Sequence, residues 1–397
     1  MDDFGIKPKK KKTGRRHKKR RALNIVLISI GALMLTCIIT IVVIFNVYMN
    51  KLEIVPYVPT TPGIDIIKEP ENVVIIDPEK LPQAEVLPEY KDTLPPDILS
   101  AESVGDSDVT ITPDDATGFR IDVNDIENEK IKIRNWYNSG TPIYSANVTN
   151  ILLMGIDNRS AAEIGRSDAM ILVSINKSKK EITLVSFMRD NFSYMTDGTF
   201  ELFHKLNHTY YRGGPELTVS TIENLFKIRI DNYVVASMLE FPGIIDTLGG
   251  IYLDVDSVVA DRYGWDNGVQ LLNGEKSLLY SRFRKVGSDL ERTSRQQMVI
   301  FGVMDRFRSS SLSDINSALD LLLPSIRTGV TKTGVLGYAS TAFFDGWGSY
   351  GNSNLSVPNS DYRYGAMLRE SVYWFVDYPA QSQALQMTLY GATNIGL

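Results

Sequence analysis

Short apolar runs alternate with segments of helical periodicity over the part of the chain that follows Pro142. The runs end at turn residues and predict buried strands over residues 150–157, 169–176, 181–188, 233–238 and 249–255. Apolar positions recur every three or four residues and predict helices over residues 214–226, 241–250 and 288–307. We therefore expect a packed α/β domain. Residues 309–397 are expected to complete the same domain, because no linker separates them from it.

The four-residue segment KSKK, residues 177–180, separates two of the predicted strands and predicts a β-hairpin. With a loop of this length, residues i and 357 − i face each other, so Asn176 pairs with Glu181. The same register places Asp168 opposite Arg189 at one end of the sheet, with Cβ atoms ~5 Å apart. Asp157 ends its own strand nearby if that strand neighbours the hairpin.

Residues Leu23–Val47 contain no charged side chain, and 25 helical residues are long enough to cross a bilayer. Residues 1–21 carry eleven Lys/Arg and two Asp, a net charge of +9, so the overall −5 leaves −14 on the rest. Such a basic flank predicts the cytoplasmic side of a membrane. A nucleic-acid patch or a cleaved signal peptide is the alternative interpretation. We expect a basic cytoplasmic tail over 1–21, one transmembrane helix over 22–48, and an extracytoplasmic remainder.

The many prolines of residues 49–144 predict that this segment is organised differently from the packed domain that follows it. Eleven of the 17 prolines lie between Lys51 and Pro142, a density that blocks long helices and central strands. We expect an extended stalk, followed by the packed domain over residues 145–397. The β-rich pieces 72–76 and 131–134 are candidates for edge strands that dock on the domain.

Composition excludes several kinds of site. The single cysteine, Cys37, excludes a disulfide framework, a cysteine-rich zinc module and an iron–sulfur cluster. The sequence also contains neither a Walker loop nor a G-x-S-x-G elbow. The chemistry must come from other residues.

Charged residues gather where the predicted apolar elements end. They lie in the segments GIDNR (155–159), RSD (166–168), MRD (188–190) and YSRFRKVGSDLERTSRQQ (280–297). Carboxylate oxygens suit Mg²⁺, and arginine guanidinium groups bind phosphate oxygens in pairs. Two aspartates with several arginines therefore predict a magnesium–pyrophosphate site. Ion pairs that only cap the sheet end are the alternative interpretation.

A set of motifs also follows in one order over residues 150–308: GIDNR, RSDAMILVSIN, VSFMRD, KLNHTYYRGG, IDTLGG and LNGEKSLLYSRFRKVGSDLERTSRQQ. This set closely resembles the LytR-CpsA-Psr family of bacterial cell-wall proteins. The resemblance implies a three-layer α/β/α domain with a central mixed sheet, behind one transmembrane helix and an extended stalk. It implies a Mg²⁺-dependent phosphotransferase that moves a teichoic acid, capsule or related glycan from a polyprenyl-pyrophosphate carrier onto peptidoglycan, at the cell membrane.

The resemblance assigns expected roles to individual residues. It gives Asp157 and Asp168 as magnesium ligands. It gives as catalytic the residues Arg189, Arg282, Arg284 and Arg292. It gives as substrate-binding the residues Arg159, Arg166, Asp190, Asp289, Arg295 and Gln296. Met188 departs from the family, because proline is usual at its position.

Two other functions share these features. A metal-dependent pyrophosphate hydrolase would use the same residues with water as the acceptor, and a cell-surface regulator would use none of them catalytically. An arginine-rich site argues against a pure regulator, since it favours a polyanionic ligand. We expect a lipid-linked glycan donor, a peptidoglycan acceptor and the membrane as partners, and no nucleic acid.

Overall fold

The computed structural model describes residues 43, 45–59, 61–81, 126–157, 165–237, 241–283, 289–368 and 371–396. The chain divides into two compact units, Met1–Lys51 and Leu52–Leu397. Over the described residues, no helix is both long and apolar enough to cross a bilayer. The basic tail over 1–21 and most of the span predicted over 22–48 lie outside the described residues.

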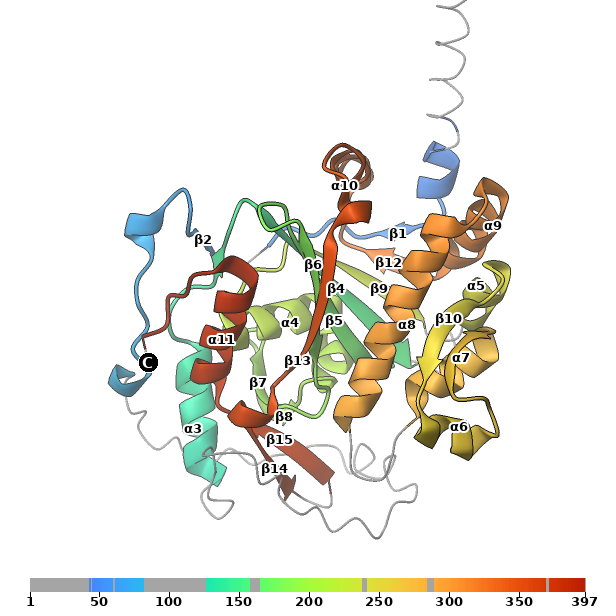
Figure 1. The fold of residues 1–397 in the computed structure, drawn as a ribbon. Coiled ribbons are helices and arrows are strands. Elements are labelled where there is room, and N and C mark those ends of the chain that lie inside the picture. The colour runs from blue at the N-terminus through green and yellow to red at the C-terminus, as the bar shows by residue number, and fades with distance from the viewer. Residues whose placement is uncertain are drawn as a thin grey trace, which may run out of the picture. The chain divides into compact units, whose positions relative to one another are not determined.

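A seven-stranded mixed sheet forms the centre of the second unit, in the order β1-β12-β9-β4-β5-β6-β13 (Figure 1). The pairs β1/β12, β9/β4 and β6/β13 are parallel and the other three pairs are antiparallel. These strands are β1 (Glu53–Ile54), β4 (Val148–Asp157), β5 (Arg166–Asn176), β6 (Glu181–Phe187), β9 (Asn232–Ser237), β12 (Ile326–Thr328) and β13 (Gly351–Val357). The predicted α/β class with a mixed central sheet is confirmed.

Four small two-stranded sheets surround the main sheet. They pair β2 (Ile64–Asp65) with β3 (Ile143–Tyr144), β7 (Phe192–Thr196) with β8 (Glu201–Lys205), β10 (Ile251–Val255) with β11 (Gly268–Leu272), and β14 (Arg363–Leu368) with β15 (Ser371–Val376).

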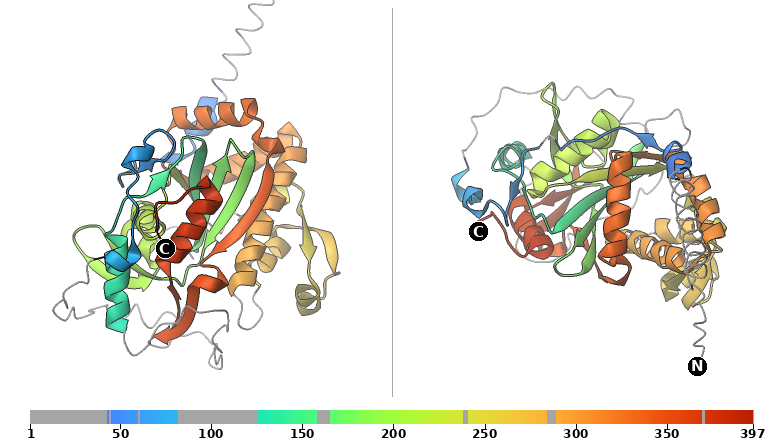
Figure 2. Two further views of the ribbon diagram at one scale, coloured as in Figure 1. Left: turned by 60° about the vertical axis from the view of Figure 1, so that its left-hand side comes forward. Right: turned by 90° about the horizontal axis from the view of Figure 1, so that it is seen from above.

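Helices cover both faces of the main sheet (Figure 2). The described helices of the second unit are α3 (Ile126–Tyr137), α4 (His208–Phe226), α5 (Phe241–Thr247), α6 (Ser257–Tyr263), α7 (Gly274–Arg282), α8 (Asp289–Ser309), α9 (Leu312–Leu322), α10 (Lys332–Phe344) and α11 (Tyr378–Tyr390). Short 3₁₀ turns lie at Pro70–Asn72, Pro78–Lys80, Leu323–Ser325, Trp347–Ser349 and Ser360–Tyr362.

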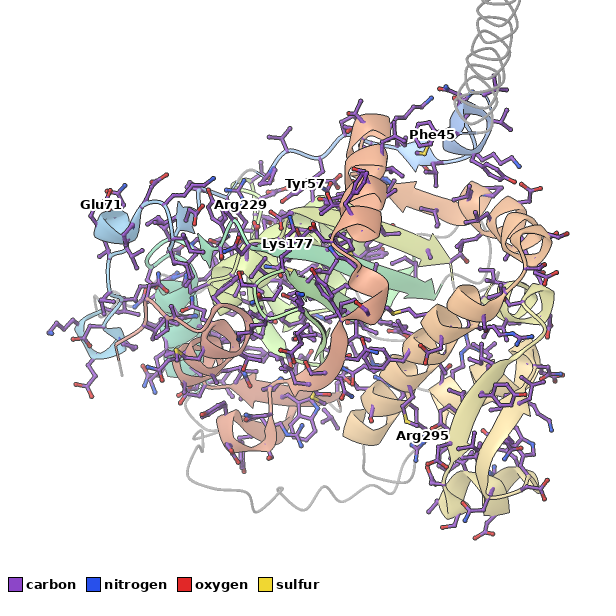
Figure 3. The ribbon with its side chains drawn as sticks, turned by 45° about the horizontal axis from the view of Figure 1, so that its top comes forward. Phe45, Tyr57, Glu71, Lys177, Arg229 and Arg295 are labelled. Atoms are coloured by element: carbon purple, nitrogen blue, oxygen red, sulfur yellow. The ribbon has the colours of Figure 1, made fainter. Side chains whose placement is uncertain are left out.

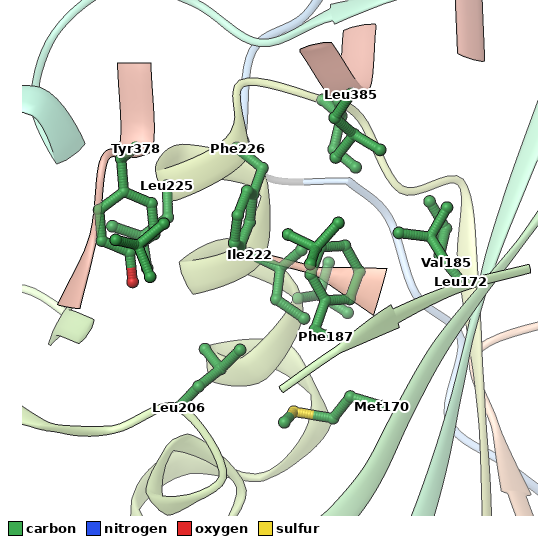
Figure 4. Close-up of a cluster of buried hydrophobic side chains, with 14 of the residues drawn as sticks. Met170, Leu172, Val185, Phe187, Leu206, Ile222, Leu225, Phe226, Tyr378 and Leu385 are labelled. Carbon is green, nitrogen blue, oxygen red and sulfur yellow. The ribbon is translucent and has the colours of Figure 1, made fainter. Parts of the chain in front are cut away.

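Alternation along the central strands explains why both faces are covered. On β5, Leu172 belongs to the large core that includes Ile222 of α4 and Leu385 of α11 (Figure 4). The next residue, Val173, faces the other way and packs in a separate cluster with Met304 of α8. Strands that are apolar on both sides therefore need a helical layer on each face.

The β5–β6 hairpin has the predicted register. Asn176 pairs with Glu181, and the ladder continues without a shift to Ile171 opposite Ser186. The β4–β5 ladder, by contrast, changes register near its end: Gly155 pairs with Ala169, and Ile156 pairs with Ser167. Asp168 is therefore the extra residue of a β-bulge, a feature that redirects a side chain at the end of a ladder.

Most of the predicted elements lie where the sequence places them, but the two candidate edge strands differ. Asn72 ends a 3₁₀ turn, and within residues 72–76 only Ile76 forms a β-bridge. Residues 131–134, a candidate edge strand, lie inside helix α3. Trp136 of this helix is buried and its indole N–H donates to the Leu225 carbonyl at 2.7 Å. Burial of one side of α3 outweighs the local β-propensity of its isoleucines.

The described parts of the predicted stalk are hydrogen-bonded to the rest of the second unit. Strand β1 extends the main sheet beyond β12, and β2 pairs with β3. Ile76 is buried and forms a bridge with Ile395 near the end of the chain. Its N–H donates to the Asn394 carbonyl, and its own carbonyl accepts from the N–H of Gly396. The boundary at residue 145 stays a prediction.

Two carboxyl groups, one buried and one partly buried, lie at the end of the sheet at which β4 and β9 begin. The Asn150 N–H donates to Asp231 Oδ2 at 2.7 Å, and the Ile230 N–H donates to Glu223 Oε1 at 2.7 Å. Burial raises the pKa values of both carboxyls, and that of Glu223 to about 7. Tyr57 and Arg229 lie on this side of the unit (Figure 3) and interact electrostatically with both carboxylates.

Gln297 fastens helix α8 to the sheet. Its buried amide nitrogen donates to the Leu184 and Leu355 carbonyls and to the Ser186 hydroxyl, at 3.3, 2.9 and 2.8 Å. Its carbonyl oxygen accepts from the Asn354 amide at 2.8 Å. One side chain thus connects α8 to both β6 and β13.

We predict that Gln297→Leu lowers the free energy of unfolding by about 2–4 kcal/mol, because an apolar side chain of similar size removes the hydrogen bonds that Gln297 makes to these buried partners. Urea denaturation would measure the change. Gln270→Leu is the matched control, since the amide of Gln270 donates to the exposed backbone carbonyl of Asp266. Equal midpoints for the two variants would contradict this role of Gln297.

Glu223 predicts a specific pH dependence of stability. Its carboxyl keeps a proton up to about pH 7 in the folded chain, whereas an unfolded chain releases that proton near pH 4.3. Raising the pH between these values therefore costs stability. Between pH 5 and pH 8, the free energy of unfolding of the wild-type protein should fall by roughly 2–3 kcal/mol relative to that of Glu223→Gln. Unfolding curves of both proteins at each pH would show this, and parallel pH profiles would refute it.

Candidate functional site

The Asp168–Arg189 pair lies at the sheet end where β4 and β6 finish and β5 begins. Arg189 Nη1 donates to Asp168 Oδ1 at 3.0 Å. This contact is the one that the hairpin register predicts. Both side chains are partly exposed, Asp168 at 31% and Arg189 at 22%, so a solute can reach them.

The ion-pair network continues from Arg189 to strand β8. Arg189 Nε lies 3.4 Å from Asp190 Oδ2, and Lys205 Nζ lies 3.0 Å from Asp190 Oδ1. The Lys205 ammonium also lies 5.3 Å from the centre of the Tyr373 ring on β15, a cation–π distance. Opposite charges therefore alternate along the series Asp168, Arg189, Asp190, Lys205.

Asn207 completes this group of residues. Its Nδ2 donates to Asp168 Oδ1 at 3.1 Å, and its backbone N–H donates to the Arg189 carbonyl at 3.1 Å. Lys205 and Asn207 were not among the predicted site residues, although both lie in the KLNH part of a family motif. Their position in that motif was the signal available in the sequence.

Met188 stands where the family usually has proline, and its backbone N–H makes a hydrogen bond that proline cannot make. The Met188 N–H donates to the Val357 carbonyl at 2.8 Å, which continues the β6–β13 pairing by one residue. Proline has no N–H. The Met188 sulfur also accepts from Arg363 Nη1 at 3.4 Å.

The four ionised groups of the network have opposite charges that cancel. Asp168 and Asp190 contribute two negative charges, and Arg189 and Lys205 contribute two positive charges. A polyanion such as pyrophosphate gains little from a neutral cluster. Binding of such an anion at this cluster would therefore need further arginines or a divalent cation.

Arg295 has a defined partner in the structure. This buried side chain donates from Nη2 to Asp256 Oδ2 at 2.9 Å, and its guanidinium lies 5.0 Å from the centre of the Phe283 ring. Figure 3 labels Arg295 on α8. Burial acts to raise the pKa of the Asp256 carboxyl, but the Arg295 bond and two backbone N–H groups of α6 outweigh it and hold the pKa below its ordinary value. Arg295 thus connects α8 to α6.

The other predicted site residues are described to different extents. Arg292 is buried near the start of α8, and Arg282 is exposed at the last residue of α7. Gln296 is partly exposed on α8. The backbone of Asp157 pairs with that of Arg166 at the end of the β4–β5 ladder. Asp289 is the first residue of α8.

Arg159 and Arg284 lie outside the described residues. The structure thus brings together Asp168, Arg189 and Asp190. That Asp157, Arg282 and Arg284 join these residues in one site stays a prediction. Among the described side chains, no group of three or more His, Cys, Asp and Glu is placed to hold a metal ion.

Comparison with known proteins finds one family over most of the chain. The sequence profile described as "LytR_cpsA_psr family" matches residues 115–388. The polyisoprenyl-teichoic acid–peptidoglycan teichoic acid transferase TagU of Bacillus licheniformis is 33% identical over 189 residues, which is 46% of this chain and 60% of that protein. The corresponding transferase TagV of Bacillus subtilis is 30% identical over 252 residues, 60% of this chain and 63% of that protein.

Solved structures agree with the fold. The crystal structure of B. subtilis TagV has a TM-score of 0.50 and 29% identity, and covers 62% of this chain and 98% of that one. A structure described as "TagT bound to LI-WTA" has a TM-score of 0.50 and 25% identity, and covers 62% of this chain and 90% of that one. The sequence matches span less than two thirds of each curated relative.

Proposed function

The chain belongs to the LytR_cpsA_psr family, and on that basis we propose that it is a phosphotransferase that attaches a polyprenyl-pyrophosphate-linked glycopolymer to peptidoglycan. The observation that carries the proposal is the Asp168–Arg189 pair, held at an accessible sheet end by a hydrogen bond of 3.0 Å. The names of TagU and TagV as teichoic acid transferases, and the LI-WTA bound to TagT, support the class of donor.

In this proposal Arg189 binds the pyrophosphate. Its guanidinium is held on both sides, by Asp168 at Nη1 and by Asp190 at Nε. A fixed planar donor of this kind suits phosphate oxygens, and a positioned charge costs no reorganisation during the reaction. Lys205 balances the charge of Asp190, so that Asp190 orients Arg189 without adding net negative charge.

We further propose that Mg²⁺ binds at Asp157 and Asp168. Mg²⁺ commonly uses one or two carboxylates together with water and substrate phosphates, so a site with two aspartates fits this ion. The neutral charge of the network around Arg189 also favours a cation beside a pyrophosphate. The ion would supply charge neutralisation on the phosphate oxygens.

The remaining arginines would supply the excess positive charge. Arg282, Arg284 and Arg292 bind the non-bridging oxygens in this proposal. Arg159, Arg166, Asp289 and Gln296 would complete the substrate contacts. Arg295, paired with Asp256, would act by holding the start of α8 in place.

The proposed reaction is a substitution at phosphorus. A sugar hydroxyl of peptidoglycan attacks the sugar-proximal phosphorus and forms a phosphodiester. The bond from that phosphorus to the bridging oxygen breaks, and polyprenyl phosphate leaves. The hydroxyl proton passes to a carboxylate of the site. Catalysis then consists mainly of positioning and charge neutralisation.

We also propose that residues 22–48 anchor the protein in the cell membrane, with the N-terminus in the cytoplasm. The basic residues 1–21 and the uncharged segment Leu23–Val47 support this orientation. Cys37 is the only cysteine, so Cys37→Ser with Asn273→Cys gives one label site in the domain. A membrane-impermeant maleimide should label this variant on cells whose wall has been removed, without permeabilisation. Labelling only after permeabilisation would reverse the orientation.

The function itself is tested by supplying the full chain with a lipid-pyrophosphate-linked glycan and peptidoglycan oligomers. We expect a covalent glycan–peptidoglycan product and release of polyprenyl phosphate. Recovery of free phosphorylated glycan alone would identify a hydrolase, and absence of any turnover would favour a regulator.

Arg189→Lys should lower the rate of transfer at least ~10-fold, since lysine keeps the charge but loses the planar fork. Arg262→Lys, at an exposed position of α6, is the matched control and should keep the wild-type rate. Wild-type turnover by Arg189→Lys, together with insensitivity to magnesium chelation, would contradict the mechanism.

A further inference from the structure

Asn207 occupies the N-cap of helix α4, yet its side chain does not cap the helix. Asparagine is favoured at this position because its side-chain oxygen accepts a backbone N–H of the first turn. Five other helices, α6, α7, α9, α10 and α11, have such a side-chain hydrogen bond at their N-caps. In α4 this hydrogen bond is absent, although asparagine at an N-cap normally makes it.

The backbone of Asn207 explains how the side chain becomes available for another partner. Its φ and ψ are −64° and −15°, which are helical values, whereas the capping Asn273 of α7 is extended at −74° and 177°. The Asn207 amide instead points to the site and donates from Nδ2 to Asp168 Oδ1 at 3.1 Å. Its side chain is almost completely buried, so this direction is fixed by the packing around it.

The same residue holds both partners of the Asp168–Arg189 pair. Its backbone N–H donates to the Arg189 carbonyl at 3.1 Å, while its amide donates to Asp168. Asp168 Oδ1 therefore receives two donors, Asn207 Nδ2 and Arg189 Nη1. Two donors on one oxygen fix the plane of the carboxylate, and hence the direction in which its second oxygen points.

We propose that Asn207 is a positioning residue: its amide orients the Asp168 carboxylate and aligns it with Arg189 for the pyrophosphate, at the expense of the helix cap of α4. This inference rests on the proposed function, because it assigns Asn207 a part in the same site. It requires that the orientation of the Asp168 carboxylate affects how the site binds the pyrophosphate.

Substitutions at Asn207 separate this role from a purely structural one. Aspartate caps helices as well as asparagine does, so a capping role predicts that Asn207→Asp resembles wild type and that Asn207→Ala is worse. A positioning role predicts the opposite order, because Asn207→Asp sets a second carboxylate against Asp168 whereas Asn207→Ala only removes a donor. Asn273→Asp is the matched control, since Asn273 is a true cap that accepts from the Lys276 N–H at 2.9 Å.

The experiment measures transfer, thermal unfolding and binding of inorganic pyrophosphate on the full chain. We expect Asn207→Ala to lower kcat about 10-fold with KM changed less than about 3-fold, and Asn207→Asp to lower kcat about 100-fold. The unfolding midpoint of Asn207→Ala should fall by no more than about 3 °C. Asn273→Asp should match wild type in every measurement.

The outcomes distinguish this inference from the proposed function. Wild-type kcat and pyrophosphate affinity for both Asn207 variants, with transfer intact in the wild type, would overturn the positioning role alone. If the wild type shows no transfer, but pyrophosphate affinity falls in the order Asn, Ala, Asp, the positioning role stands and the transferase proposal fails. An activity order of Asn, Asp, Ala would assign Asn207 to capping and overturn the inference.

Discussion

The hydrogen-bonded register between β5 and β6 is the constraint on which the candidate site depends. Because side chains alternate between the two faces of a sheet, a slip by one residue would send each side chain of one strand to the other face. Leu172 would then leave the large core, and Asp168 would no longer face Arg189. The core and the site are thus fixed by the same ladder, so the apolar packing that holds this register also keeps the ion pair in place.

Local features of the site could be predicted from the sequence, and features that depend on distant contacts could not. The loop at 177–180 sets the register by itself, so the Asp168–Arg189 contact followed from counting residues. The bulge at Asp168 depends on how β4 meets β5, which no local pattern specifies. Asn207 comes from a turn some forty residues away from Asp168, and only the folded chain brings its amide to the carboxylate.

Arginine and glutamine residues that lie close together in the sequence of α8 make different contacts in the structure. Arg292, Arg295 and Gln296 share one face of α8 by spacing, yet Arg295 is committed to Asp256. Gln297, beside Gln296, bonds four partners on the sheet and connects it to α8. Sequence spacing identifies which residues share a helix face, but neighbouring elements decide whether each one serves binding or packing. Residues 131–134 illustrate the same limit, because burial beside Trp136 makes a helix of a segment with β-propensity.

The bridge between Ile76 and Ile395 affects how the domain can be divided. Both residues lie outside the segment 115–388 that matches the family, one before it and one after it. Their side chains are nevertheless part of the large hydrophobic core. A fragment cut at the family boundaries would lose both side chains together, leave a cavity beside Gly140, whose backbone approaches Ile76 closely, and expose apolar surface to water. The evolutionary unit recognised by sequence is therefore smaller than the physical unit that packs, and expression of a shortened chain should begin before Ile76 and extend past Ile395.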